Sequence, residues 1–422
     1  MKNVGRILIA QKHLVLTLLV SLILIGGCAS TYNPRPVEEV PFKKRAQTKH
    51  QGAIRVTAAV LSAEESEEIF GVPLYKKSIQ PIWLEIQNNA KQPVWFFPAG
   101  VDPEYFSSLE AAYMYRSGFS EQARKQMDQH FYKRGIGIYI GPGTVRSGFV
   151  FTNLDEGTKT FNVDLVAEDH QAGSFTFIIP VPGLKVDHSE VDFKTLYSED
   201  EIVTHDEKGL RKALENLPCC TTSGDGTEQS DPLNIVVIGN LEDVYHALIR
   251  ARWDETETIY AKSAVKTAIS FLFGGRYRYS PVSGLYVFGR RQDAALQKAR
   301  ETIHERNHLR LWLTPMRFEE KPVWIGQISR DIGVRFTSKT IVTHKIDPDV
   351  DETRDYLLQD LLYSQGLAKF AYVKGVGAAP ISEPRENLTG DPYFTDGYRV
   401  VMWVSSKPVP LEDIEFVSWE VP

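Results

Sequence analysis

The segment 344–355 holds the richest set of candidate ligands in the chain. Its candidate metal ligands are His344, Asp347, Asp349 and Asp351. Imidazole with carboxylate suits zinc or manganese, and clustered carboxylates suit hard divalent cations. The spacing is not that of an EF-hand, because Glu352 stands where that loop needs glycine. The segment therefore predicts a divalent-metal or acid–base site.

The same carboxylates also have a structural interpretation. Either Asp347 or Asp349 can cap the helix that the following residues predict, and Pro348 suits its first turn. Acidic side chains at that end also offset the positive pole of the helix dipole. Capping accounts for one or two of the acids and leaves His344 without a role, so both interpretations stand.

A second group of chemically competent residues lies on two predicted strands. Strict alternation over 308–313 places His308 and Arg310 on one face and three leucines on the other. Arg330 and Asp331 follow a later strand, and open α/β sheets bind ligands at strand ends. The complete candidate site, catalytic or binding, is His308, Arg310, Arg330, Asp331, His344 and Asp347.

In such a site the arginines would bind an anion, and histidine with aspartate would act as a base or as metal ligands. The alternative is a set of paired interior polar groups, which is the usual state of polar residues on a covered sheet.

Arginine and tyrosine gather in a third place. The candidate anion-binding residues are Arg276, Arg278, Arg290 and Arg291. Guanidinium groups bind phosphate and carboxylate with two parallel hydrogen bonds. The Gly274-Gly275 pair is no phosphate-binding Walker loop, because no Gly-Lys-Ser/Thr follows. A solvated loop whose tyrosines cover the edge of the core is the alternative.

Cys219 and Cys220 are adjacent. A bond between them would be a strained ring, since disulfides prefer a Cα separation of roughly 4.4–6.8 Å and neighbouring Cα atoms are ~3.8 Å apart. The pair predicts either two loop thiols or a strained ring that only rigidifies a turn, or else a redox-labile or reactive thiol site.

The predicted second domain, residues 231–410, must position most of these side chains. Its first strand, 233–238, is almost continuously apolar, as in strands buried on both faces, and Asn240 can cap the helix that follows. Further helices are predicted at about 255–273, 292–306 and 350–362, and further strands at 285–288, 308–313, 322–329, 340–344, 368–373 and 398–404. This succession predicts an α/β domain with a mixed sheet, followed by a tail at 411–422.

Residues 51–184 have a different pattern, with mostly two-residue periodicity. Strands are predicted at 54–60, 82–87, 94–97, 144–151, 160–166 and 174–179. Phe119, Ala123, Met127 and Phe131 interrupt them at helical spacing. The chain is therefore expected to be multidomain, with an N-terminal β-sandwich carrying a helical insert. A connector, residues 185–230, contains a helix candidate at 207–217 and the Cys-Cys loop.

The N-terminus has the pattern of an export signal. Lys2, Arg6 and Lys12 precede a largely apolar run from Leu14 to Ile25, which is too short to span a bilayer. The net charge of −6 becomes more negative if residues 1–27 are removed, which argues against nucleic acid as a partner.

The Gly26-Gly27-Cys28 end of this run resembles a bacterial lipobox, which implies cleavage before Cys28 and fatty acylation of its thiol. Ala29 resembles the arrangement that permits sorting to the outer membrane. Residues 28–50 are predicted to be a polar tether. The expected location is the cell envelope, lipid-anchored at the outer membrane and facing the periplasm.

Residues from about 210 to 375 resemble the LssY C-terminal domain family. The resemblance rests on six motifs in order: Leu217–Thr222, Asp231–Asn234, Tyr286–Arg290, Asn307–Trp312, Ser329–Gly333 and Thr343–Asp351. The family is named for association with a type I secretion locus and has no established activity, so the resemblance implies a domain type and assigns no catalytic residue.

Two functions remain open. The first is a non-catalytic envelope module that binds a partner protein, a glycan or a lipid. The second is a hydrolase-type enzyme acting on a phosphorylated or ester-linked envelope component, with the His/Arg/Asp site and a divalent metal as its candidate machinery.

Overall fold

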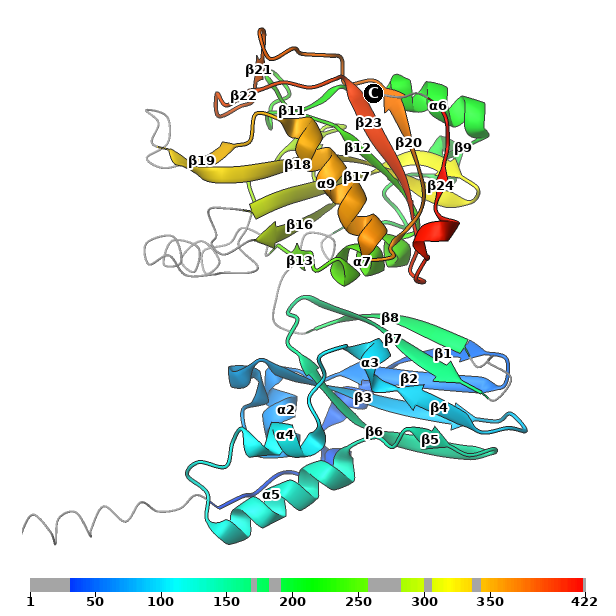
Figure 1. Ribbon diagram of the computed structural model, residues 1–422, viewed down its shortest axis with the longest axis vertical. Coiled ribbons are helices and arrows are strands. Elements are labelled where there is room, and N and C mark those ends of the chain that lie inside the picture. Colours follow the sequence, from blue (N-terminus) through cyan, green and yellow to red (C-terminus); the bar gives the residue numbers. More distant parts are fainter. Residues whose placement is uncertain are drawn as a thin grey trace, which may run out of the picture. The chain divides into compact units, whose positions relative to one another are not determined.

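The computed structural model describes residues 31–167, 173–181, 191–256, 282–299, 306–335 and 343–419. The chain divides into two compact units, one made of residues 1–154 and 164–173 and the other of 155–163 and 174–422. The described residues are mostly β-strand with few helices (Figure 1). The predicted multidomain layout is compatible with this division.

Two four-stranded sheets are found in the N-terminal part. The first has the antiparallel order β1 (Gln47–Gln51), β2 (Ile54–Val60), β3 (Ile79–Asn88), β6 (Thr144–Asn153). The second has the order β5 (Tyr139–Ile140), β4 (Val94–Phe97), β7 (Thr158–Val166), β8 (Gly173–Pro180). The strands predicted from two-residue periodicity are confirmed.

Helices of the first unit pack on an aromatic core. They are α2 (Ala63–Phe70), α4 (Ser108–Tyr113) and α5 (Glu121–Arg134), while α3 (Pro98–Val101) lies against β6. The Phe70 ring lies 4.9 Å from that of Phe131 and 5.1 Å from that of Phe149. The predicted helical insert is α5, which buries Ala123, Met127 and Phe131.

The tether prediction is wrong for the described part of residues 28–50. Residues Val37–Glu39 and Pro41–Arg45 form short 3-10 helices, and β1 pairs with β2. Val37, Val40 and Phe42 are buried in the core of the first unit, Phe42 with 0% exposure. The mostly polar composition of the segment led to the tether prediction. Its three apolar side chains are nevertheless buried, and their burial stabilises the packing of the segment on the first unit.

The second unit contains a ten-stranded sheet among its described residues. Its main order is β13 (Asp254–Glu255), β16 (Ala294–Ala299), β17 (Arg306–Phe318), β18 (Lys321–Arg335), β12 (Ile235–Ile238), β23 (Tyr398–Val404), β20 (Leu367–Lys374), β24 (Glu415–Phe416), with β19 (Thr343–Ile346) on β18 and β9 (Val203–His205) on β17. β12 runs parallel to β23 and antiparallel to β18, so the sheet is mixed.

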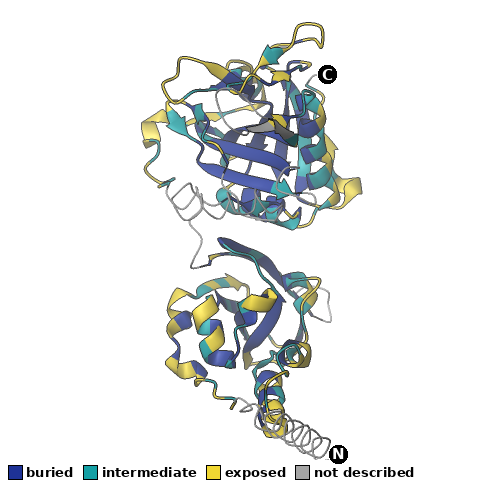
Figure 2. Ribbon diagram, turned by 90° about the vertical axis from the view of Figure 1, so that its left-hand side faces the viewer, coloured by how far each residue is buried: buried dark blue, intermediate teal, exposed yellow. Residues whose placement is uncertain are grey.

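Both faces of this sheet are covered. On one face α7 (Leu241–Arg250) and α9 (Val350–Tyr363) pack on Ile235, Val237 and Leu309. On the other, α6 (Glu207–Glu215) packs on Val236 and Ile238. Figure 2 shows the sheet strands as almost wholly buried. Asn240 caps α7 by accepting from the Asp243 amide at 2.8 Å, as predicted.

Smaller elements lie beside this sheet. β10 (Cys220–Thr222), β11 (Gln229–Pro232), β14 (Tyr286–Val287) and β15 (Arg290–Arg291) form a four-stranded sheet, and β21 (Arg385–Glu386) pairs with β22 (Pro392–Tyr393).

The predicted helix at 292–306 is wrong. Its residues 294–299 form β16, which pairs with β17 in antiparallel register, Leu296 opposite Leu309. The helix-favouring composition of Ala, Leu, Gln and Lys is overridden because Ala294 and Leu296 complete the core under α7 and α9. Most of the predicted helix at 255–273 lies outside the described residues.

Gly326 of β18 tests the packing at the centre of the sheet. A Cβ at this position would lie 2.7 Å from Cγ1 of Ile235 and 2.7 Å from Cδ2 of Leu311. We expect Gly326→Ala to lower the free energy of unfolding by about 1–3 kcal/mol, because the overpacked neighbours must shift.

Gly333→Ala in the same strand is the matched control, since nothing lies within 4 Å of its Cβ position. Chemical denaturation of both variants measures the difference. Equal stability of the two variants would contradict the close packing at Gly326.

Candidate functional site

The candidate residues on β17 and β18 include one close His–Asp pair. Nε2 of His308 lies 2.8 Å from Oδ2 of Asp331, and both side chains are buried. Nε of Arg306 lies 3.6 Å from the same carboxylate oxygen. Antiparallel pairing of β17 with β18 places these side chains on one face of the sheet. The predicted association of His308 with Asp331 is therefore present.

Burial sets the protonation state of this pair. Loss of solvent lowers the pKa of His308 to about 4, with the Asp331 carboxylate opposing and the Arg306 guanidinium reinforcing the shift. The imidazole is therefore neutral at pH 7, with Nε2 in contact with the Asp331 carboxylate. A neutral imidazole that is buried among protein groups has a structural explanation and requires no role in substrate binding.

Arg310 lies on the same face as His308, and its contacts are internal. It donates to Oε1 of Gln327 at 2.7 Å and to the Ser283 carbonyl at 3.1 Å. Gln327 belongs to the neighbouring strand, opposite Arg310 in register. This guanidinium is thus held within the second unit.

Arg330 belongs to the opposite face of the sheet. It donates to Oδ1 of Asn307 at 3.0 Å, pairs with Glu352 of α9 at 2.6 Å and lies over the Tyr356 ring. Because side chains alternate along a strand, Arg330 and its neighbour Asp331 point to different faces. The six-residue site is therefore divided, with His308, Arg310 and Asp331 on one face and Arg330 on the other.

The acidic segment contributes to the start of α9. Asp349 caps the helix by accepting from the Glu352 amide at 3.1 Å, and Oδ1 of Asp347 accepts from the Asp349 amide at 3.1 Å. His344 pairs through its backbone with Val334, and its side chain lies outside the described part. Within the described residues no cluster of three or more His, Cys, Asp or Glu side chains is arranged to hold a metal ion.

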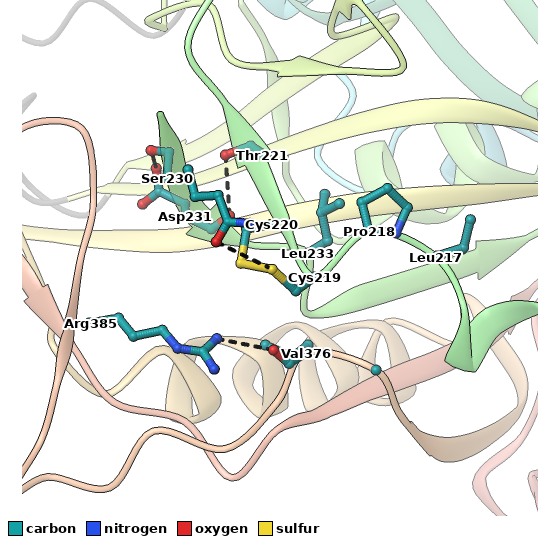
Figure 3. The surroundings of a disulfide bond; sticks show 12 residues. Leu217, Pro218, Cys219, Cys220, Thr221, Ser230, Asp231, Leu233, Val376 and Arg385 are labelled. Carbon is teal, nitrogen blue, oxygen red and sulfur yellow. Dashed lines mark hydrogen bonds between the residues drawn. A yellow bond between two sulfur atoms is a disulfide. The ribbon is translucent and has the colours of Figure 1, made fainter. Parts of the chain in front are cut away.

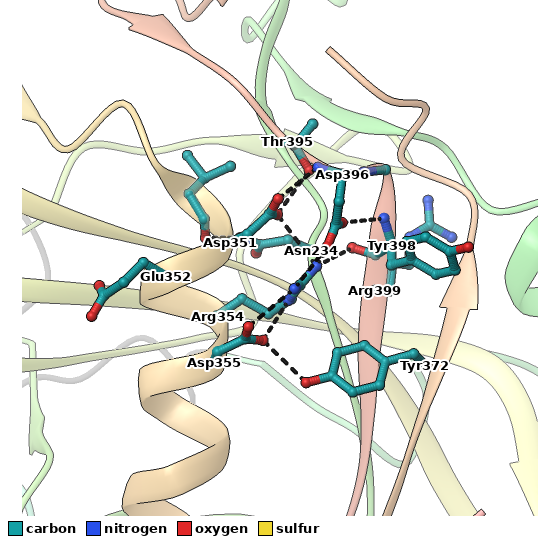
Figure 4. A network of polar contacts seen from close by, with 12 residues as sticks. Asn234, Asp351, Glu352, Arg354, Asp355, Tyr372, Thr395, Asp396, Tyr398 and Arg399 are labelled. Carbon is teal, nitrogen blue, oxygen red and sulfur yellow. Dashed lines mark hydrogen bonds and ion pairs between the residues drawn. The ribbon is translucent and has the colours of Figure 1, made fainter. Parts of the chain in front are cut away.

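Arg354 organises the remaining carboxylates (Figure 4). Its side chain, 1% exposed, donates to Asp355 at 2.8 Å and to Asp396 at 2.9 Å and 3.1 Å. Asp351 accepts from the Asp396 amide at 2.6 Å and from the Thr395 hydroxyl at 2.8 Å. These contacts join α9 to the chain before β23, so Asp351 has a structural role.

The importance of Arg354 was not predicted. Its position four residues after Val350 and three before Leu357 places it within the buried stripe of α9, which is the signal that could have identified it. A shallow pocket of about 720 Å³ opens beside this network, lined in part by Asp349, Asp351 and Ile381.

Cys219 and Cys220 form a disulfide between neighbouring residues, with their Cα atoms 3.7 Å apart (Figure 3). The Leu233 amide donates to the Cys219 carbonyl at 2.8 Å, and Cys220 pairs with Pro232 in β11. The structure therefore contains the ring, one of the two states left open by the sequence. Either predicted role, rigid turn or redox-labile bond, is compatible with this arrangement.

Arg399 of β23 holds the chain that leads into the disulfide. Its buried guanidinium donates to the carbonyls of Leu214, Leu217 and Pro218. Burial lowers the pKa of Arg399 to about 10. Leu214 belongs to the last turn of α6, and Leu217 and Pro218 follow it, where main-chain carbonyls lack partners four residues later in a helix. The sequence signal that could have identified Arg399 is a single charged residue within the otherwise mostly apolar strand 398–404.

A pocket of about 320 Å³ lies beside the disulfide. Its lining residues are Pro218, Cys220, Thr222, Ser223, Gly224, Asp225, Gly226, Tyr286, Val287, Phe288 and Gly289. Phe288 is 42% exposed and has a φ of 55°, a conformation that bulky residues rarely adopt. The aromatic residues were not predicted as site residues.

The Asp225 carboxylate at this pocket is held ionised. Hydrogen bonds from the Ser223 hydroxyl and from the backbone and hydroxyl of Thr227 lower its pKa to about 2. The pocket thus combines two aromatic side chains, hydroxyl groups and one carboxylate.

The predicted arginine cluster is described only in part, because Arg276 and Arg278 lie outside the described residues. Arg290 pairs with Asp293 through two hydrogen bonds of 3.0 Å and 2.9 Å and donates to the Tyr197 hydroxyl at 2.9 Å. Its guanidinium is therefore already engaged by protein groups. Arg291 lines a separate pocket of about 490 Å³ with Asp192 and Asp293.

Comparison with known proteins agrees with the motifs in the second unit. Residues 212–398 match the family described as LssY C-terminus, as predicted. No curated protein and no solved structure matches the chain significantly. The matched segment includes the disulfide, the His308–Asp331 pair and Arg354.

The buried imidazole makes a prediction about stability and pH. Between about pH 6.5 and pH 4 the unfolded chain binds a proton at His308 that the folded chain does not, so stability is present above pH 6.5 and falls as the pH drops. At roughly 1.4 kcal/mol per pH unit, this residue accounts for a loss of about 2 kcal/mol at pH 5.

The His308→Gln variant lacks this titration. The difference in unfolding free energy between wild type and variant should therefore shrink by about 2 kcal/mol from pH 7.5 to pH 5. Denaturant titration at the two pH values measures it. A difference that stays constant would mean that His308 binds its proton equally well in the folded state.

Proposed function

From the premise that residues 212–398 carry an LssY C-terminal domain, we propose that the chain is an exported, lipid-anchored envelope protein that binds a ligand without converting it. It is attached through Cys28 to the outer membrane and faces the periplasm. In this proposal residues 51–184 form a β-sandwich with a helical insert, and residues 231–410 form a mixed α/β domain.

The Cys219–Cys220 disulfide supports an exported location. Disulfides persist in oxidising compartments such as the periplasm and are rare in the cytosol. Among the described residues no helix is long and apolar enough to cross a membrane. The anchor in this proposal is the acyl group that the lipobox-like sequence around Cys28 would receive.

The observation that carries the binding role is the division of the polar residues between two buried faces. Arg330 is separated from the His308–Asp331 pair by the sheet itself, and each of these groups already contacts protein partners. A hydrolase needs its base and its anion-binding group within reach of one reacting atom. The pocket beside the disulfide is open to ligand and is therefore the proposed binding site.

The chemistry of that pocket fits a saccharide. Tyr286 and Phe288 offer apolar ring faces, while Thr222, Ser223 and Asp225 offer hydrogen-bonding groups at its rim. Binding sites for small molecules commonly combine mostly apolar walls with a few placed polar groups. The proposed ligand is an uncharged sugar unit of an envelope glycan, because the described lining includes a carboxylate and no basic side chain.

The hydrolase remains the second candidate, and one observation favours it. The 2.8 Å contact between His308 and Asp331, with Arg306 beside the carboxylate, resembles a base held by its orienting acid. Turnover of a chromogenic phosphate or acyl ester that Asp331→Asn abolishes would favour this candidate over the binding role.

Anchoring is tested at Cys28. We expect Cys28→Ala to remove the acyl group and to move the protein from the membrane fraction to the soluble fraction, because no thiol remains to be acylated. Mass spectrometry of the N-terminal peptide and fractionation of cells measure both effects. An uncut, unacylated N-terminus in the wild-type protein would contradict the proposal.

Ligand binding is tested at Phe288. We expect Phe288→Ala to reduce retention of the protein on isolated cell-wall glycan at least fivefold, because an exposed ring face of the pocket is lost. Tyr363→Ala, which removes an exposed aromatic side chain outside the pocket, is the matched control. Equal retention of both variants and the wild type would exclude this pocket as the glycan site.

A further inference from the structure

The folded first unit begins very close to the proposed lipid. Tyr32 already packs on it, with its ring 5.9 Å from that of His130 and 6.3 Å from that of Phe119. Cys28 is four residues earlier in the sequence. Four residues span at most about 14 Å, even when fully extended. An acyl chain on Cys28 therefore leaves no room for a long spacer.

We propose that the first unit docks directly on an anionic bilayer surface, with the outer face of α5 turned toward the phospholipid headgroups. This inference rests on the acylation of Cys28 proposed above. The short connection keeps the surface around Tyr32 within reach of the headgroups, so the groups exposed there meet the membrane.

The contacts of α5 identify which of its faces is exposed near Tyr32. His130 lies against Tyr32 on one flank of the helix. Asp128 pairs with Arg116 on the other flank, since residues two apart in a helix point about 200° from each other. Ala123, Met127 and Phe131 are buried. The remaining face lies between the two flanks and is open.

This face has the composition of a membrane-binding surface. Tyr132 is 71% exposed on α5, and Tyr113 at the end of α4 is 67% exposed. Lys125 and Lys133 are exposed basic residues on this face of α5, and Figure 1 shows this helix along one edge of the first unit. Tyrosine is enriched at the level of the headgroups, and basic side chains are attracted to anionic lipids.

Acidic groups on the outer face do not cancel this charge. Glu121, the acidic residue of the first turn of α5, pairs with Lys125 at 2.7 Å, and Asp128 pairs with Arg116. Lys133 then remains as positive charge on the exposed side of the helix. Charge complementarity therefore favours a negatively charged bilayer as the occupant.

The chain is well suited to a site-specific probe. Once Cys28 is acylated and Cys219 is bonded to Cys220, an introduced cysteine is the single free thiol. Gln129→Cys places an environment-sensitive fluorophore on the exposed face of α5. Lys91→Cys, in the exposed turn between β3 and β4 at the other end of the first unit, is the control (Figure 1).

The mature acylated protein is reconstituted into vesicles of phosphatidylethanolamine with phosphatidylglycerol, or of phosphatidylcholine alone. The probe at position 129 should become at least twofold brighter on the anionic vesicles than in detergent, and the probe at position 91 should not change. The double change Lys125→Glu with Lys133→Glu should remove most of the gain.

The outcomes separate the two proposals. If the protein does not sediment with vesicles, acylation at Cys28 fails and both proposals fall. If it sediments and the probe at position 129 stays dim, docking alone is overturned. An equal response on neutral vesicles overturns the anionic surface as the partner, and a gain in detergent that grows with protein concentration assigns the face to a second copy.

Discussion

The central strand β12 is covered on both faces, and this constraint shapes the whole second unit. Ile235 and Val237 face the helices α7 and α9, while Val236 and Ile238 face α6. A polar side chain on such a sheet loses its water, and burial without a partner is costly. Charged residues on this sheet therefore need partners supplied by the protein, and much of the hydrogen bonding around them follows from that need.

Three arginines, two on this sheet and one on the helix α9 that covers it, illustrate how this requirement is met. Arg354 contacts the carboxylates of Asp355 and Asp396, and Arg399 donates to main-chain carbonyls near the disulfide. Arg330 joins β18 to α9 through Glu352. Breaking a buried charged pair is strongly destabilising, so residue types that suggest catalysis can be retained for the fold alone. The pocket beside the disulfide differs because its aromatic and hydroxyl groups are accessible at the protein surface.

Much of the fold could be predicted from periodicity and capping residues. The strands at 54–60, 94–97 and 398–404 and the helix that begins after the N-cap Asn240 follow from local patterns that tertiary packing reinforces. The segment 294–299 could not be predicted, because its helix-favouring residues are held as a strand by pairing with β17. The burial of Phe42 could not be predicted either, because a single aromatic residue among polar neighbours shows neither helical nor strand periodicity.

The candidate site was predicted as a set of residue types, and its geometry came from the tertiary structure. The sequence by itself determined the LssY-like motifs, the adjacent cysteines and the alternation that puts His308 beside Arg310 on one face, because these depend on chain chemistry and a two-residue repeat. Only the tertiary structure decided that Asp331 meets His308 while Arg330 meets α9. Strand register and the covering helices set that outcome, and both depend on contacts between residues far apart in the chain.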